Sequence, residues 1–277
     1  MSRFRDKREA FKQRAEQGVK DRQKSAGKYS VVRLGKIDNI NFFKPSPDKQ
    51  KRNLIDIIPF FVTQNWAAKM RGFNGDALGV EVGDMLYKLE VPVHGQGCGA
   101  LEFPQLCLKS AFGKPCSVCD DRESLKEDSN VDEDIIGTLY PRWKVYYNLR
   151  DKNEPDKTKR RKVWESPYHS FEKFFLDEAD MGTEGYVIFA DPEEGKTIKF
   201  KGRKKHFKSK GGQMVDYLEA ESIEFIDRKR QYTEDDIKKS ISFDKYLAIP
   251  TYEEVEKAYL GTEDDSEKGA GKKKKEK

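Results

Sequence analysis

The chain has 277 residues, of which 37% are charged and 36% hydrophobic, and its formal net charge is +5. This length suffices for one large domain or two small ones, and the high charge predicts much surface, arm or tail. No apolar run approaches the length of a membrane span, and the N-terminus lacks the apolar core of a secretion signal. The cysteines suit a metal better than disulfides, which favours a reducing interior.

Residues 1–30 are predicted to form a basic arm. Lysine and arginine dominate it, and few apolar side chains such as Phe4 and Phe11 are spaced between them. A helix of this composition would bury too little apolar surface to fold alone. A solvated arm and an arm that docks on a neighbouring molecule or on phosphates both remain open.

Between the arm and the C-terminal region the pattern predicts mostly strands. Short β-branched and aromatic runs are separated by turn residues. Many short strands with few crossover helices predict a mainly β (α+β) fold built on a small barrel or sandwich. Internal helices are expected only at 170–179 and 233–241. The expected strands are 53–62, 85–93, 143–151, 161–166, 186–190, 197–202 and 217–225.

The cysteines near the middle of the chain predict a zinc site. Cys116 and Cys119 form a C-x-x-C pair, whose thiolates flank a tight turn and converge on one tetrahedral ion. A second pair of ligands must come from upstream, and His94 with Cys107 has the spacing to supply it. Buried or disulfide-bonded cysteines are the alternative, but they fit a lone C-x-x-C better than this set.

Cys98 competes with His94 for one ligand position, because it lies only four residues further along the chain. A shell of one histidine and three cysteines and an all-cysteine shell therefore both remain open on spacing. Either shell fills every coordination position, so the zinc is expected to be structural and not catalytic. The ion would hold together a small loop-rich subdomain at about residues 90–125.

The strand expected at 143–151 carries aromatic and basic side chains. Strict alternation places Trp143 and Tyr147 on a face suited to a core, and Lys144 and Tyr146 on a wet, cationic face. Aromatic rings stack on unpaired bases while cations neutralise phosphates, which predicts a groove for single-stranded nucleic acid. An ordinary amphipathic strand beside a solvated loop is the alternative. The residues predicted to contact the strand are Tyr140, Arg142, Trp143, Lys144, Tyr146, Tyr147, Lys159, Arg160, Lys162, Lys204 and Lys205.

The C-terminal region is predicted to begin with a helix and to continue as a tail. Thr251 and Glu254 have the spacing of a capping box that opens a helix through Leu260. The low-complexity residues that follow, up to 277, are expected to be unfolded.

Catalytic motifs are missing from the sequence, which has no P-loop, nucleophile elbow or H-E-x-x-H. His169 and His206 lie in aromatic or basic company, so general-base candidates are few, and the protein is expected not to be an enzyme. A zinc-stabilised scaffold that binds RNA or protein is the remaining alternative. No finger helix is expected after the cysteines.

The zinc spacing, followed by the strand W-K-V-Y-Y-N-L-R-D, resembles the single-stranded-DNA-binding proteins of T-even-type tailed bacteriophages over roughly residues 30–225. The zinc shell of that family has one histidine and three cysteines, with twelve residues between the histidine and the first cysteine. The spacing of His94 and Cys107 matches, so the resemblance favours His94 over Cys98.

The resemblance implies an OB-fold barrel core at 31–250 with an inserted zinc subdomain, a helical N-terminal arm and, at 251–277, a terminal helix with a disordered tail. It implies one structural Zn²⁺ and sequence-independent binding of single-stranded DNA, which prevents re-annealing during phage DNA replication, recombination and repair. Expected partners are further copies along the DNA, reached through the arm, and replication and recombination proteins, reached through the tail. The expected location is the cytoplasm of the infected bacterial host, without membrane attachment.

Two features depart from the family. Its members typically end in a long acidic tail that competes with DNA, whereas the acidic patch at 263–267 is short and is followed by lysines at 272–275. The basic triplet that supports cooperative binding in the family has no clear counterpart in the arm, although Arg3 and Arg5 could serve.

Overall fold

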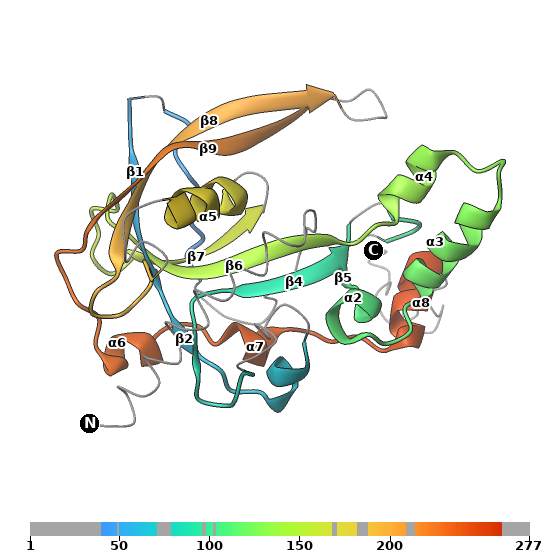
Figure 1. Ribbon diagram of the computed structural model, residues 1–277, viewed down its shortest axis with the longest axis horizontal. Coiled ribbons are helices and arrows are strands. Elements are labelled where there is room, and N and C mark those ends of the chain that lie inside the picture. The colour runs from blue at the N-terminus through green and yellow to red at the C-terminus, as the bar shows by residue number, and fades with distance from the viewer. Residues whose placement is uncertain are drawn as a thin grey trace, which may run out of the picture.

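Figure 1 shows the computed structural model, coloured along the chain. The structure describes residues 40–48, 50–70, 79–95, 98–101, 104–167, 171–181, 188–208 and 214–261. The predictions for the arm at 1–30 and the tail at 262–277 therefore lie outside the described residues.

An antiparallel sheet is organised around β6 (Arg142–Asp151). β4 (Leu89–His94) pairs with the first half of β6, and β1 (Asn53–Ile58) pairs with its second half. β7 (Arg161–Pro167) pairs with β6 from Lys144 to Arg150. β6 thus connects most of the sheet, and its side chains have neighbours on several strands.

The sheet has seven strands and continues from β1 through β8 (Lys196–Lys208) to β9 (Met214–Asp227). Its other end is β5 (Gln105–Leu106), which pairs with β4. Within the described residues these ends do not pair with each other, so the sheet is open and the expected closed barrel is not formed. The predicted mixture of a strand-rich sheet with helices is confirmed.

Most of the sequence-predicted strands are present, with changed ends. Pro59 has no N–H for a ladder and divides the run 53–62 into β1 and β2 (Phe60–Phe61). The run 85–93 divides into β3 (Met85–Leu86) and β4, and β3 pairs with β2 in a small second sheet. Residues 188–190 form a turn, so the strand predicted at 186–190 is wrong there. β6, β7, β8 and β9 confirm the runs at 143–151, 161–166, 197–202 and 217–225.

Helices cover the sheet and form a separate group at one end of it. α5 (Glu172–Met181) confirms the helix predicted at 170–179, as far as it is described, and packs on β9. α6 (Glu234–Lys238) is shorter than the predicted 233–241. α7 (Phe243–Tyr246) and the 3-10 helix η1 (Asn65–Lys69) were not expected from the sequence.

The group at the end of the sheet contains α2 (Leu108–Phe112), α3 (Ser117–Glu127) and α4 (Glu133–Thr138) (Figure 1). α8 (Tyr252–Leu260) lies more than 120 residues later in the sequence and packs against α3. The predicted capping box of α8 is confirmed, because Thr251 and Glu254 satisfy each other's backbone N–H groups. The subdomain around the cysteines is therefore rich in helices, and the expectation of a loop-rich module is wrong.

Both faces of β6 are buried. Tyr147 packs in the larger core cluster with Trp164 and Phe200, and Tyr146 packs in a second cluster with Phe243. Successive strand residues point to opposite faces, so a strand between two clusters carries apolar side chains on both. The alternation read from the sequence is present, but neither face is a wet surface in this part of the strand.

A charged cluster surrounds the buried Asp56 of β1. Asp56 is fully buried and accepts hydrogen bonds from Tyr232 at 2.6 Å, from Lys152 at 2.9 Å and from Thr197. The guanidinium of Arg228 lies 3.9 Å from the same carboxylate. Because Asp56 is on β1 and its partners come from later strands and turns, the cluster ties the sheet to the segment after β9.

Candidate metal centre and nucleic-acid interface

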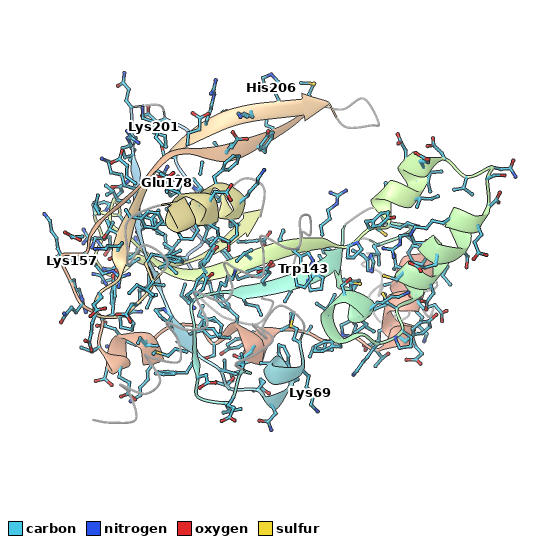
Figure 2. All side chains as sticks on the ribbon, in the orientation of Figure 1. Lys69, Trp143, Lys157, Glu178, Lys201 and His206 are labelled. Carbon is cyan, nitrogen blue, oxygen red and sulfur yellow. The ribbon has the colours of Figure 1, made fainter. Side chains whose placement is uncertain are left out.

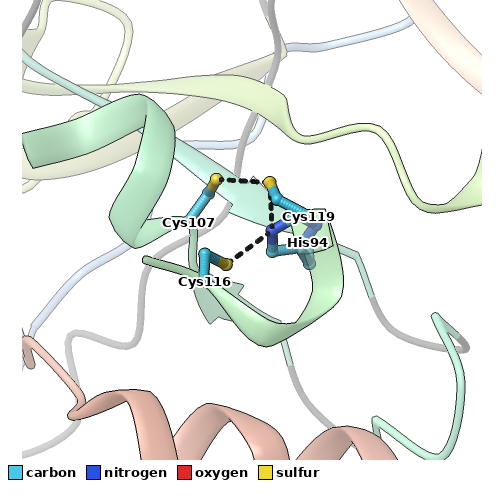
Figure 3. A group of neighbouring side chains, drawn as sticks. All are labelled: His94, Cys107, Cys116 and Cys119. Atoms are coloured by element: carbon cyan, nitrogen blue, oxygen red, sulfur yellow. Dashed lines mark hydrogen bonds between the residues drawn. The ribbon is translucent and has the colours of Figure 1, made fainter. Parts of the chain in front are cut away.

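Secondary structure brings His94 and three cysteines to one place (Figure 3). His94 is the last residue of β4, and Cys107 is the N-cap of α2. Cys116 is the N-cap of α3, and Cys119 lies in the first turn of that helix. The chain reverses between the helices at Gly113, whose φ of 69° suits glycine. The four ligands predicted from the sequence therefore converge.

The distances between the ligand atoms fit one tetrahedral ion. The Nε2 atom of His94 lies 3.4 Å from the Sγ of Cys116 and 3.7 Å from that of Cys119. The Sγ atoms of Cys107 and Cys119 are 3.5 Å apart, and all four ligand atoms lie within 4.8 Å of one another. Around a tetrahedral zinc with bonds of about 2.0–2.3 Å, neighbouring ligand atoms are about 3.5–3.8 Å apart. The cluster could hold a metal ion.

The orientation of His94 leaves Nε2 directed at the thiols. Its Nδ1 atom lies 3.0 Å from the main-chain oxygen of Leu139, so Nδ1 carries the proton and donates it. A histidine ligand is commonly held in this way by a carbonyl or carboxylate behind it. Cys98 is also buried, but it is not part of the group of converging ligand atoms. Of the two candidates that spacing left open, His94 is therefore the one whose ligand atom lies with the thiols of Cys107, Cys116 and Cys119.

Among the protein atoms alone, the thiols and the imidazole perturb one another. Burial lowers the pKa of His94, but hydrogen bonds with Cys107, Cys116 and Cys98 outweigh it and raise the pKa to about 11. Hydrogen bonds with Cys107 and Cys119 lower the pKa of Cys116, and the same group of thiols raises that of Cys119. A divalent cation must displace these protons, so metal binding would release them.

A buried cation lies beside the cluster. Arg122 follows Cys119 by one helical turn on α3, and only 9% of its surface is exposed. Burial lowers the pKa of this guanidinium, but a hydrogen bond with Glu123 and the charge of Cys119 raise it by more than burial lowers it. The pKa is therefore above its ordinary value. Three thiolates and a neutral imidazole around a divalent ion carry a net charge of about −1. Arg122 is placed to offset that charge.

The buried core of this metal module, which comprises α2, α3, α4 and α8 with the ends of β4 and β5, includes the C-terminal helix. Val255 of α8 is fully buried in one cluster with the cysteines and Leu139. Tyr259 donates a hydrogen bond to Asp121 of α3, and its carbonyl accepts the N–H of Ala100 at 2.9 Å. Residues far apart in the sequence thus close the module around the candidate metal site.

Three of the predicted DNA-contacting aromatics lie in the core. Tyr146 and Tyr147 are fully buried, and Trp143 is 5% exposed. Figure 2 labels Trp143 in the middle of the view, near β4 and β6. The expectation that Tyr146 lies on a solvent-facing surface is wrong, because β6 is buried on both faces. None of these rings offers a free face to a base in this structure.

Several of the predicted cations are paired with carboxylates. Lys144 contacts Glu165 on β7. Lys162 lies 2.9 Å from Asp151 and 2.9 Å from Glu154. Lys205 on β8 pairs with Glu219 of β9. Arg203 and Lys199 on β8 also pair with acids of β9, so a row of ion pairs joins the two strands. The basic run at 199–210 is therefore partly neutralised by its partner strand.

Five of the predicted residues remain available to a ligand. Tyr140 is 45% exposed, and Arg142 and Lys204 are exposed with no carboxylate partner in the described parts of the chain. The ammonium of Lys159 lies 3.4 Å from Asp156, but its side chain is 63% exposed. Arg160 is half-buried and donates its Nε proton to the carbonyl of Glu154. Tyr140 and Arg142 are two residues apart in the chain, where the metal module meets β6.

Sequence reasoning missed Arg122 and the acidic residues of β9. Arg122 lies three residues after Cys119, a spacing that places both side chains on one face of a helix. The alternating acids Glu219 and Glu221 were visible in the sequence, and a hairpin pairing of 197–202 with 217–225 would have placed them opposite lysines and arginines.

No protein-family model matches the chain, and no curated protein shows significant similarity to it. Among the described residues, no helix is both long and apolar enough to cross a membrane.

Proposed function

We propose that the protein binds single-stranded DNA largely independently of sequence and has no catalytic activity. The observation that carries this proposal is the exposed ring of Tyr140, which lies two residues before Arg142 at the junction of β6 with the metal module; Arg142 is exposed and has no carboxylate partner among the described residues. An exposed aromatic with an exposed cation close to it in the chain suits an unpaired base and its phosphate. Duplex DNA hides its base faces, so this combination favours single strands.

The cluster of His94, Cys107, Cys116 and Cys119 would hold one structural Zn²⁺. Support comes from the ligand set of one imidazole and three thiols, which zinc prefers in closed tetrahedral sites. With all four positions taken by protein atoms, the ion would stabilise the module and would not bind substrate.

The phosphates would be neutralised by Arg142, Lys159 and Lys204, which the structure leaves exposed, and by the half-buried Arg160. Lys144, Lys162 and Lys205 are held by carboxylates and would contribute less. Trp143, Tyr146 and Tyr147 would act through the core that supports the surface and not by stacking.

The wider setting is also proposed and is supported by the sequence resemblance over residues 30–225. In this setting the open sheet would be a variant of the OB-fold. The protein would protect single strands during phage replication, recombination and repair in the host cytoplasm. The arm at 1–30 would contact neighbouring copies, and the tail would contact replication and recombination proteins.

A salt titration tests the electrostatic part of the proposal. Binding of a dye-labelled oligo-dT should weaken with salt, with a log–log slope of about −0.7 for each phosphate neutralised. Arg142→Gln should make that slope shallower by about 0.7. Lys69→Gln, which removes an exposed cation from η1, is the matched control and should leave the slope unchanged. An unchanged slope for Arg142→Gln would remove this residue from the interface.

Binding of RNA is the second candidate, because stacking and phosphate neutralisation tolerate either sugar. The same titration with oligo-U of equal length separates the two. Tighter binding of oligo-U than of oligo-dT would favour an RNA-binding role.

A further inference from the structure

Tyr140 is fixed at its backbone by the candidate metal site. It directly follows Leu139, whose carbonyl oxygen accepts the Nδ1 proton of His94 at 3.0 Å. The side chain of Leu139 is 3% exposed and packs in the cluster that contains the cysteines. The residue before Tyr140 is therefore held both by packing and by a hydrogen bond to a metal ligand.

The ring of Tyr140 is also held from one side. The guanidinium carbon of Arg122 lies 4.4 Å from the ring centroid, and the ammonium of Lys126 lies 5.3 Å from it. Arg122 and Lys126 are four residues apart on α3 and so project from the same side of that helix. Both cations reach the ring from α3, while 45% of the tyrosine surface stays exposed.

Arg122 connects this ring to the metal site. It lies one turn after Cys119 on α3, and only 9% of its surface is exposed. Its guanidinium lies 2.5 Å from the carboxylate of Glu123. The net negative charge of a metal-bound His-Cys₃ shell would hold a buried guanidinium in place. The position of the ring thus depends on the metal ligands through two separate connections, one from His94 and one from Cys119.

We propose that Tyr140, backed by Arg122, is a stacking platform for one unpaired nucleobase, and that the metal site sets its position. This inference rests on the proposed binding of single-stranded DNA and names where a base is held. A ring fixed on one side by a cation loses little freedom when a base stacks on its open side. Arg122 is a positioning residue, and Tyr140 makes the contact.

The test compares two labelled strands of equal length, oligo-dT and a strand of abasic sites that keeps the phosphates. Tyr140→Leu keeps apolar volume but removes the ring, and should weaken oligo-dT binding by about 5- to 150-fold, the range for one stacked base. Tyr140→Phe should restore most of the loss. Abasic strands should bind Tyr140→Leu as tightly as they bind the unchanged protein.

Two further variants complete the test. Tyr246→Leu removes a partly buried tyrosine that also has a lysine near its ring, at 5.8 Å, but lies on α7, and it should bind both strands normally. Arg122→Gln at saturating zinc should lose part of the preference for oligo-dT over the abasic strand, because the ring loses its backing. Metal content and far-ultraviolet circular dichroism confirm that each variant is folded.

The outcomes separate the platform from the function on which it rests. Tight, salt-sensitive binding of oligo-dT that Tyr140→Leu leaves unchanged would overturn the platform and keep the proposed function. An equal loss on oligo-dT and on the abasic strand would also overturn it, because the ring would then not act through bases. If the unchanged protein bound neither strand, the proposed function would fail and the platform with it.

Discussion

The main-chain oxygen of Leu139 accepts the Nδ1 proton of His94 at 3.0 Å, across 45 positions of sequence. This hydrogen bond selects the tautomer in which Nε2 faces the three thiols. It also joins the end of β4 to the segment that enters β6, the strand shared by most of the sheet. A metal bound at the cluster would therefore order the start of β6 as well as its own ligands.

Cys116→Ser should abolish stoichiometric metal binding. A serine hydroxyl is a poor zinc ligand, and loss of a structural metal is among the changes that destabilise by about 4 kcal/mol or more. Metal content by mass spectrometry and thermal unfolding measure both effects. Cys98→Ala is the control, because Cys98 is buried but not among the converging ligands, and it should keep one metal per chain. One metal per chain in Cys116→Ser would refute the ligand assignment.

Arg122→Gln should lower the affinity for zinc by about 10- to 100-fold, the range for outer groups that support metal ligands. The cause is the loss of the buried positive charge beside the thiolates. Competition against a chromophoric chelator measures the affinity. Lys126→Gln removes an exposed cation one turn further along α3 and should have little effect. Equal affinities of the two variants would show that Arg122 does not offset the charge of the shell.

Asp56→Asn should lower the free energy of unfolding by about 3–5 kcal/mol, because it leaves the buried Arg228 and its neighbour Lys152 without their counter-charge. Chemical denaturation measures the loss. Asp227→Asn removes a carboxylate that pairs with Lys196 but has a 94% exposed side chain, and should cost no more than about 1 kcal/mol. Similar costs for both substitutions would contradict a structural role for the buried cluster.

Asp236→Asn should remove a contribution to stability that is present at neutral pH and lost in acid. Burial raises the pKa of Asp236, but hydrogen bonds from Arg230 and Thr233 outweigh it, and the pKa is lowered. A carboxylate with a lowered folded-state pKa stabilises above its unfolded value of about 3.9, and this stability is lost as the pH falls through the folded value.

The unchanged protein should exceed Asp236→Asn by about 1–3 kcal/mol at pH 7, and the difference should shrink below about pH 4. Denaturation across this pH range provides the test. A difference that stayed constant down to pH 2 would show that the ionised carboxylate is not the source of the stability.

The metal ligands could be predicted from the sequence because zinc imposes a local geometry. A C-x-x-C pair at a helix start and a second ligand pair upstream suffice, whatever surrounds them. Spacing left His94 and Cys98 open, and only the fold, which ends β4 at His94, places one of them at the site. The helical form of the module escaped prediction because α2 and α4 are too short to show a period.

The surface around β6 was less predictable because burial depends on partners distant in sequence. The alternation of Tyr146 and Tyr147 was correct, but a second cluster containing Phe243 covers the face expected to be wet. The availability of Lys205 to a phosphate likewise depends on Glu219, which pairs with it and which only strand pairing brings next to the basic run. Local patterns thus gave the direction of side chains, and tertiary packing decided what each one met.

Competition between single strands and duplex measures whether the protein selects unpaired DNA. A dye-labelled oligo-dT is bound to the zinc-loaded protein at low salt, and unlabelled oligo-dT or duplex of equal length is added. If the protein binds unpaired bases and phosphates, the single strand should displace the probe, the duplex should do so only weakly, and high salt should release the probe. Failure to bind oligo-dT, or equal displacement by the duplex, would contradict the proposed function.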